Sequence, residues 1–373
     1  MFLPSGSQDE IGQKITNRSK AYEIFKNVTL SRNYKQITTP VVEYATTFTN
    51  KYAGMELRNM LKWFNHEGDI EVLRPDWTTA VARAVGNQNN SQSKWAYQGS
   101  VFRRDKDGME SRQAGIEIVH MPTFLGESEC LLTAAAYLNE LNINDYLVEL
   151  GHIGIFNELI APLNLTEQQI DQLRNAMHDK RRDDVYQIVA NAGRKDIAEE
   201  LTSLVDAYGT SAMIEEYEEK WQHNQQLLSI IQHLKRLANL LEQLNVEVIV
   251  DLGRVKNLPY YDGTMFRGYI KSNGATCFSG GRYNRLYEQF EQNISAVGLA
   301  FDVDVLAEHI EEADDRIKVC ILASEDTHAF AEKHRNNYPN AIVDIQYQRI
   351  NLDRFDKVIE VVEENAQLKV VEK

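Results

Sequence analysis

The sequence predicts an α+β protein: a mostly antiparallel sheet flanked by helices, with a helical insertion and a small C-terminal α/β domain. Three observations favour this fold class. Strand patterns stand before and after a block of helical periodicity at about residues 154–245. The 20 glycines and 7 prolines make up about 7% of the 373 residues, where about 12% is average, so long elements are expected. From about residue 315, short apolar runs alternate with one helical pattern.

The N-terminal part is expected to contain a helix, an edge strand and a hairpin. Apolar residues in the segment 10–32 recur at steps of three and four, which predicts a helix. A β segment begins at Ile37 and is interrupted by Pro40, which removes one ladder donor and favours an edge or interface strand. Two β-rich runs in residues 60–74 surround the turn signal NHEG, so a hairpin is expected.

The elements on either side of the insertion are expected to form the main sheet. Residues 95–104 and 112–121 read as an antiparallel pair joined by a polar loop, DKDGMES. A helix at 126–141 and a strand at 145–153 follow. The end of the helical block carries a core-facing or interface stripe, formed by Leu227, Ile230, Leu234, Leu237, Leu241 and Leu244.

Strand patterns resume after this stripe, at residues 246–252, in MFRGYI and in ATCFSGG. The tail then reads as strand, helix, strand and strand, with the helix at 327–338. The expected domains are therefore residues 1–314, which include the helical insertion, and residues 315–373.

Charge and cysteine content exclude several classes of protein. The 55 acidic residues outnumber the 40 basic ones, and a net charge of −15 disfavours a phosphate backbone as the main partner. No apolar run approaches the roughly 18 residues of a membrane span, and the start lacks a secretory signal pattern. The three cysteines lie far apart and are expected to be buried rather than paired. A cytoplasmic protein without metal or cofactor is expected.

Polar residues gather where the predicted strands end. Asp76 and Thr78 follow the strand that ends at Arg74. Asp76 is either a helix N-cap or, together with Thr78, an oxygen ligand for an ammonium group.

A second polar group lies on the predicted antiparallel pair. Arg103 stands near the end of its first strand, and alternation places Gln113, Gly115 and Glu117 on one face of the second. Gly115 leaves room between two polar side chains, which indicates a lined pocket rather than packed core. Taken alone, this segment fits a solvated face of an antiparallel sheet better.

Two further segments are weaker signals. Tyr260 and Tyr261 follow Pro259 and offer hydroxyls and a ring wall, although paired tyrosines are often core or interface residues. Gly280 and Gly281 close a strand and permit a close backbone approach.

In this order, the motifs resemble histidyl-tRNA synthetase over about residues 1–310. They are PSGSQDEI, ITTPVVE, LRPDWTTAVAR, GSVFRRD with QAGIE, the paired tyrosines, and GGRYNRLYEQF through AVGLAFD. The resemblance implies a class II aminoacyl-tRNA synthetase-like fold, with the Pro40 region as the dimer-forming first motif.

The resemblance also assigns roles to the polar residues. It implies that Asp76, Thr78 and Gln113 hold the amino group of histidine, that Glu117 and Tyr261 read its imidazole, and that Arg103 corresponds to the arginine at the α-phosphate of ATP. The expected histidine-binding residues are Asp76, Thr78, Arg103, Gln113, Glu117, Lys256, Tyr260 and Tyr261.

Three departures from the synthetase pattern concern ATP and tRNA. Val305 stands where the third motif carries the arginine that stacks on ATP. The loop that reaches over ATP and tRNA in synthetases is here short and acidic, so it repels a polyanion. Lys256 replaces an arginine that helps activate the histidine carboxylate, and it lacks the planar fork of that arginine.

A chain that keeps histidine recognition but loses the means to handle ATP and tRNA resembles the synthetase paralogues that regulate short-form ATP phosphoribosyltransferase. This resemblance implies a non-catalytic chain in a hetero-octamer with a dimer core, bound to short catalytic chains, with histidine as allosteric ligand and without tRNA. An active histidyl-tRNA synthetase, or a histidine sensor or scaffold with other partners, is the alternative.

Overall fold

The computed structural model describes residues 2–86, 93–104, 108–255, 260–291, 293–310, 316–364 and 367–373. Its chain divides into two compact units, residues 1–310 and 311–373. The domain boundary predicted at residue 314 falls among 311–315, which lie outside the described residues, and stays a prediction.

A nine-stranded sheet forms the framework of the first unit, with the strand order β1-β5-β6-β12-β11-β10-β7-β9-β8. Neighbouring strands are antiparallel except for β1 with β5 and β7 with β9, which confirms the predicted, mostly antiparallel sheet. The strands are β1 (Lys35–Gln36), β5 (Ser93–Phe102), β6 (Glu110–Val119), β7 (Tyr146–His152), β8 (Tyr208–Thr210), β9 (Glu247–Asp251), β10 (Thr264–Ile270), β11 (Thr276–Arg282) and β12 (Ala296–Asp302).

One face of this sheet packs against three helices, α1 (Gln13–Ser31), α4 (Thr123–Glu140) and α11 (Val303–Glu308). From β6, this face receives Ala114, Ile116 and Ile118, all fully buried. Because alternate residues of a strand point to opposite faces, the odd-numbered residues of β6 point to the other side.

The opposite face carries α3 (Trp77–Val85) and the 3-10 helix η2 (Asn284–Phe290). Trp77 stacks on Tyr97 of β5, with ring centroids 4.7 Å apart. Tyr283 and Tyr287 belong to the same buried cluster. This aromatic layer surrounds the polar residues of β6 with apolar side chains.

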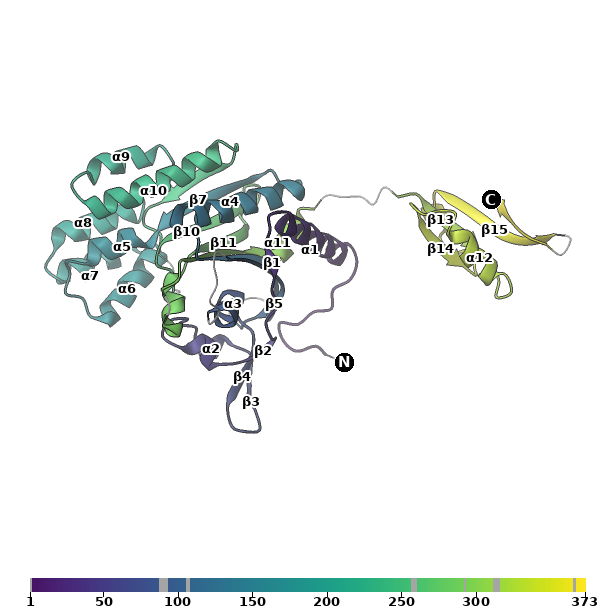
Figure 1. Cartoon of the computed structure of the whole chain (residues 1–373), viewed down its shortest axis with the longest axis horizontal. Helices are drawn as coiled ribbons and strands as arrows, with labels where there is room; N and C mark the ends of the chain where they lie inside the picture. The colour runs from purple at the N-terminus through teal and green to yellow at the C-terminus, as the bar shows by residue number, and fades with distance from the viewer. Residues whose placement is uncertain are drawn as a thin grey trace. The chain divides into compact units, whose positions relative to one another are not determined.

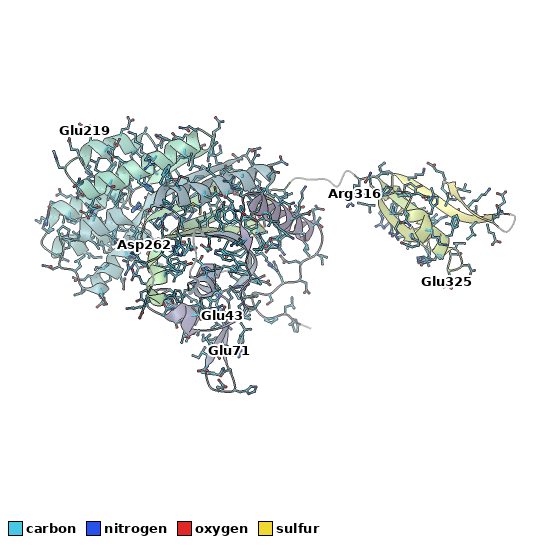
Figure 2. All side chains as sticks on the ribbon, in the orientation of Figure 1. Glu43, Glu71, Glu219, Asp262, Arg316 and Glu325 are labelled. Atoms are coloured by element: carbon cyan, nitrogen blue, oxygen red, sulfur yellow. The ribbon has the colours of Figure 1, made fainter. Side chains whose placement is uncertain are left out.

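After β1, the chain forms a small antiparallel sheet with the strand order β2-β4-β3. Its strands are β2 (Val42–Tyr44), β3 (Lys62–Phe64) and β4 (Ile70–Leu73), with α2 (Thr46–Thr49) and η1 (Leu57–Asn59) between β2 and β3. The predicted hairpin at 60–74 is confirmed. The predicted edge strand interrupted by Pro40 is confirmed as two short edge strands, β1 and β2, but the predicted start at Ile37 is wrong because β1 ends at Gln36. Figure 2 labels Glu43 and Glu71 on this sheet.

The helical insertion groups beside β7, as Figure 1 shows, and α10 contacts both β7 and β9. Its helices are α5 (Ile153–Ile160), α6 (Glu167–His178), α7 (Arg182–Asn191), α8 (Lys195–Leu204), α9 (Met213–Lys220) and α10 (Gln225–Glu242). The predicted helical block is confirmed except for β8. The stripe of α10 faces the core, but Leu244 lies beyond the helix end and is 49% exposed, so the prediction was wrong there.

The second unit has its own four-stranded sheet, ordered β14-β13-β15-β16. Its elements are β13 (Lys318–Leu322), α12 (His328–Arg335), β14 (Ile342–Gln346), η3 (Leu352–Arg354), β15 (Lys357–Glu364) and β16 (Gln367–Glu372). Val319, Ile321, Ala331 and Ile359 form its buried centre. The predicted α/β pattern is confirmed, and β16 adds an unpredicted strand that pairs antiparallel with β15.

All three cysteines are buried and unpaired, as the sequence predicted. Across the described residues, no helix combines the length and the apolar character that crossing a membrane requires.

Candidate ligand-binding site

Arg74 fixes the turn that leads from the small sheet into α3. Its guanidinium donates to the carbonyl oxygen of Thr39 at 2.8 Å and to that of Ser100 at 2.9 Å. It also lies 3.4 Å from the ring centroid of Trp77. A buried arginine needs such partners, and these hold the end of β4 against β5.

Asp76 follows this turn and caps α3. Its backbone is extended, and its Oδ2 accepts a hydrogen bond of 2.7 Å from the backbone N–H of Thr79. The capping interpretation is therefore confirmed. The second oxygen, Oδ1, lies 3.7 Å from the Arg103 guanidinium, which donates to the carbonyl oxygen of Pro75 at 2.6 Å. One carboxylate oxygen of Asp76 thus caps the helix, and the other faces the Arg103 guanidinium.

Glu117 lies at the centre of the site and is only 1% exposed. The Thr78 hydroxyl donates to its Oε1 at 2.7 Å, and the Tyr283 hydroxyl donates to its Oε2. Burial raises the pKa of Glu117 to about 8, and the charge of Asp76 adds to this, although hydrogen bonds from Tyr283 and Thr78 oppose it. Near neutral pH, this carboxyl group can therefore change its protonation state when a ligand arrives.

Two glycines make room for the side chains of the site. Gly298 lies directly opposite Glu117 in the β12–β6 pair, and a Cβ at Gly298 would overlap the Glu117 carboxylate. Gly281 lies opposite Gly298 on β11, and a Cβ there would lie 2.8 Å from the ring of Tyr261. The close approach predicted at Gly281 is confirmed: the carbonyl oxygen of Thr264, at 2.6 Å from such a Cβ, lies nearest, and the Tyr261 ring follows.

The open space predicted at Gly115 is wrong. Tyr97, its partner on β5, lays its ring over the glycine, where a Cβ would overlap the phenol. Gly115 therefore accommodates a buried aromatic ring, and the space between Gln113 and Glu117 is filled.

Tyr260 and Tyr261 close the site from the loop before β10. Their ring centroids are 4.8 Å apart, and the Tyr260 ring lies 6.3 Å from that of Tyr283 in an edge-on arrangement. Burial raises the pKa of both phenols, and the negative charge of Asp76 is the next cause. Both therefore remain protonated hydroxyls that can donate hydrogen bonds.

The structure thus brings together five of the predicted residues, namely Asp76, Thr78, Glu117, Tyr260 and Tyr261. Arg103 lies at the edge of this group, beside Asp76. Gln113 shares the face of β6 but lies farther along it, between Gly99 and Asp302. Lys256 lies outside the described residues.

Two tyrosines of the site were missed from the sequence. Tyr283 binds Glu117 directly, and Tyr97 packs beneath it. The available signal for Tyr283 was its place directly after GGR at the end of β11. Tyr97 carried no such signal, because it reads as an ordinary strand aromatic.

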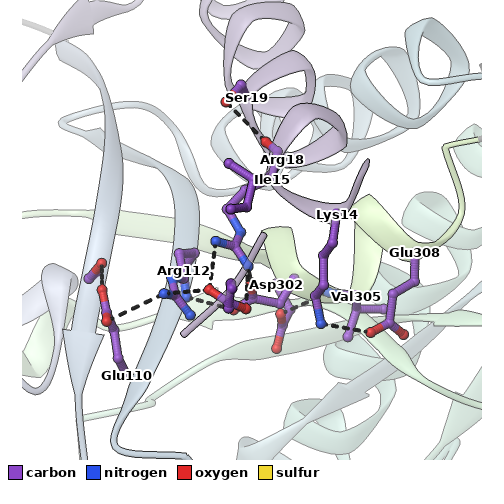
Figure 3. Close-up of polar contacts among 12 residues, drawn as sticks. Lys14, Ile15, Arg18, Ser19, Glu110, Arg112, Asp302, Val305 and Glu308 are labelled. Atoms are coloured by element: carbon purple, nitrogen blue, oxygen red, sulfur yellow. Dashed lines mark hydrogen bonds and ion pairs between the residues drawn. The ribbon is translucent and has the colours of Figure 1, made fainter. Parts of the chain in front are cut away.

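Val305 lies in α11, on the face of the sheet that also carries α1, and packs against the main core. Figure 3 shows the charged side chains around it. Glu10 pairs with Arg18 at 2.9 Å and with Arg112 at 2.8 Å. Arg18 also pairs with Asp304 at 2.8 Å. The Arg18 hydrogen bonds, together with the charges of Arg112 and Lys14, lower the pKa of Glu10.

This charged network is acidic on balance. The carboxylates of Glu10, Glu110, Asp302, Asp304 and Glu308 outnumber the cations of Lys14, Arg18 and Arg112. The cations are therefore compensated by the protein itself, and an added polyanion would meet net repulsion.

Comparisons with known proteins agree with this architecture. A family model described as histidyl-tRNA synthetase matches residues 7–306. A protein named ATP phosphoribosyltransferase regulatory subunit from Bacillus thuringiensis (strain Al Hakam) is 28% identical over 349 residues, which cover 89% of this chain and 83% of that protein.

Two solved structures share the fold. One, titled as an ATP phosphoribosyltransferase regulatory subunit/histidyl-tRNA synthetase from Bacillus halodurans C, has a TM-score of 0.82 at 24% identity and covers 96% of this chain and 97% of its own. Histidyl-tRNA synthetase from Nostoc sp. PCC 7120 has a TM-score of 0.79 at 15% identity, with 100% and 96% covered. The predicted class II synthetase-like fold is confirmed.

Proposed function

The chain belongs to the histidyl-tRNA synthetase family, and we propose that it is a non-catalytic regulatory subunit of short-form ATP phosphoribosyltransferase. In this role, the catalytic chain requires it for activity, and it carries histidine feedback inhibition at the first step of histidine biosynthesis. The relative named as such a subunit, aligned over 89% of this chain, supports the partnership.

The chemistry around Glu117 suits histidine as the ligand. Asp76 and Glu117 supply two carboxylates in a largely buried place, and Thr78, Tyr261 and Tyr283 supply hydroxyls. Carboxylates and hydroxyls accept from an ammonium group, and a carboxylate with a phenol can satisfy both nitrogens of an imidazole. The two Glu117 oxygens together offer about four lone pairs, of which the hydrogen bonds from Thr78, Tyr283 and Tyr97 use three.

The observation that carries the non-catalytic proposal is the environment of Val305. In the synthetase pattern, an arginine at this place neutralises ATP, whereas here a valine lies among side chains that are acidic on balance. Adenylation requires positive charge where the phosphoryl oxygens develop negative charge. A chain without that charge can bind histidine but lacks the means to activate it.

Histidine then acts through conformation. A ligand shifts an equilibrium only by its differential affinity for the two states, so histidine must bind one state of the assembly more tightly. The Glu117 carboxyl and the loop that carries Tyr260 and Tyr261 are the groups on which such a difference can act.

We further propose self-association through the small sheet, as the dimer core of a cytoplasmic hetero-octamer. One face of this sheet carries three exposed apolar side chains, namely Val42, Tyr44 and Trp63, whereas Phe64 is exposed on the opposite face. Contiguous exposed apolar surface of this kind is typical of a protein interface.

The binding test uses the whole chain and a short ATP phosphoribosyltransferase chain from the same genome. We expect the two to co-elute in size-exclusion chromatography, and we expect calorimetry to show histidine binding that Glu117→Ala abolishes. Separate elution would contradict the partnership, and unchanged histidine affinity in Glu117→Ala would show that another place binds histidine.

An active histidyl-tRNA synthetase is the second candidate, favoured by the family model itself and by the preserved Asp76, Thr78 and Glu117. Histidine-dependent exchange of pyrophosphate into ATP by the purified chain would establish it. We expect no exchange above background.

A further inference from the structure

A cavity of about 880 Å³ lies where the helical insertion meets the main sheet. Its walls come from β7 and β10, from the ends of α6 and α8, and from the segment after β9. Strands β12 and β11 separate β10 from β6, which carries Glu117. At about 4.8 Å per strand, the cavity floor is roughly 14 Å from the site described above.

The charged side chains that line the cavity leave one net positive charge, with Lys180, Arg254, Arg267 and Lys271 against Glu149, Asp206 and Asp251. Lys180 pairs with both oxygens of Asp251 at 3.1 Å, and Arg254 pairs with Glu149. Arg267 lies opposite Glu149 in the β10–β7 register but donates to the Tyr269 hydroxyl, at 2.7 Å, which in turn donates to Glu149. Among the described residues, Arg267 forms no ion pair with a carboxylate.

Arg254 is also incompletely satisfied. It is 6% exposed, and its Nε and one terminal nitrogen, Nη2, have no hydrogen-bond partner in the described part of the chain. Burial, with the positive charge of Arg267 as the next cause, lowers the pKa of Arg254 to about 10. Arg254 and Arg267 thus both lie beside Glu149, and the second nearby carboxylate, Asp251, is already paired with Lys180. An additional anion would recover part of the free energy that this arrangement costs.

We propose that this cavity is a binding site for a phosphate group, either as inorganic phosphate or as the phosphate of a small ester. A guanidinium presents paired N–H donors that match phosphate oxygens, and Arg267 adds positive charge at the same wall. The volume falls within the range of about 300–1,000 Å³ that is usual for small-molecule sites. Tyr208 and Tyr269 line the cavity and offer ring faces to an organic substituent.

The site does not depend on the proposed function, since it uses none of the residues assigned to histidine or to the catalytic partner. The test is calorimetric titration of the whole chain with inorganic phosphate and, separately, with phenyl phosphate. Each titration is matched to sodium chloride of equal ionic strength. We expect saturable binding of at least one probe at one site per chain. Arg267→Gln should weaken the affinity for that probe by about tenfold or more, because a hydrogen-bonded charge contact is lost.

Two control variants keep the test independent of folding. Arg58→Gln removes the same charge from a 79% exposed side chain outside the cavity, and we expect unchanged affinity. Arg267→Lys keeps the charge but loses the planar fork, and we expect an intermediate affinity.

The relative affinities of the two probes identify the source of the phosphate. Tighter phenyl phosphate assigns an ester, and tighter inorganic phosphate assigns the free anion. Absence of saturable binding for both probes, or equal losses in Arg267→Gln and Arg58→Gln, would overturn the proposal.

Discussion

At the scale of single residues, Glu117 is the group on which the account depends most. Its carboxylate lies inside an aromatic layer and accepts hydrogen bonds from Thr78 and Tyr283. Water is nearly excluded, so the ionised form of Glu117 is disfavoured. A cationic ligand or an imidazole N–H would stabilise that ionised form by its charge or its hydrogen bond. Ligand binding and proton release at Glu117 are therefore expected to be coupled.

The pH dependence of stability tests this environment. The pKa of Glu117 rises from an ordinary 4.5 to about 8 in the folded chain. Between these values the folded state holds a proton that the unfolded state has lost, so Glu117 lowers stability progressively as the pH rises from about 5 to 8. Glu117→Gln stays neutral, so it should gain stability over the wild type across this window, by about 1.4 kcal/mol per unit of pKa shift.

Urea unfolding at pH 5 and pH 8.5 measures this difference for both proteins. Every other group titrates alike in the two chains, so the difference isolates Glu117. Parallel stability curves would show that Glu117 is ionised at an ordinary pKa and would contradict the buried site.

Gly298 is the second residue on which the site depends. An added Cβ would overlap the Glu117 carboxylate. Gly298→Ala should therefore destabilise the fold by about 1–3 kcal/mol and weaken histidine binding, because either Glu117 or β12 must shift. Gly209→Ala on β8 is the matched control, since its Cβ would meet only the Met213 sulfur at 3.8 Å. Urea unfolding and calorimetry of both variants make the comparison, and equal effects would contradict the packing described.

At the scale of elements, a buried charge cluster joins the insertion to the main sheet. Glu127 on α4 is 0% exposed and accepts from Arg282 of β11 at 2.6 Å and from Thr264 of β10 at 2.9 Å. His233 of α10 lies 2.5 Å from the same carboxylate. Hydrogen bonds and positive charges from His233 and Arg282 lower the pKa of Glu127 despite its burial. One carboxylate thus holds α4, α10 and two strands together.

Loss of this carboxylate charge should loosen the insertion. Glu127→Gln leaves Arg282 buried without a counter-charge, which should cost about 3–5 kcal/mol. The free energy of unfolding in urea measures the loss, and hydrogen exchange should show faster exchange along α10. Glu140→Gln, at an exposed position of the same helix, is the control. A loss no larger than that of the control would contradict the role of the cluster.

The order of elements was predictable because it depends on local patterns. The hairpin at 60–74, the β5–β6 pair and the helical insertion follow from turn residues and apolar periodicity. Interactions between distant segments were not predictable. Tyr97 fills the space over Gly115, and Tyr283 reaches Glu117 from 166 positions away, so neither contact leaves a local signal. The edge strand around Pro40 was predicted, but not that its two halves, β1 and β2, belong to different sheets.

At the scale of the whole molecule, the exposed face of the small sheet is the proposed self-association surface. Tyr44 is 50% exposed there. Tyr44→Glu places a charge in the interface and should shift the chain toward the monomer by at least about tenfold in dissociation constant. Sedimentation velocity measures the shift. Leu244→Glu changes a side chain that is 49% exposed at the end of α10 and should have no effect. If only Leu244→Glu dissociated the oligomer, the interface would lie elsewhere.

The central claim is that this chain regulates a catalytic partner and does not catalyse a reaction itself. The most direct measurement is the rate at which a short ATP phosphoribosyltransferase chain from the same genome forms product, with and without this chain and with added histidine. We predict that this chain raises the rate, that histidine lowers it again, and that Glu117→Ala keeps the activation but loses the inhibition. An unchanged rate in the presence of this chain would contradict the account.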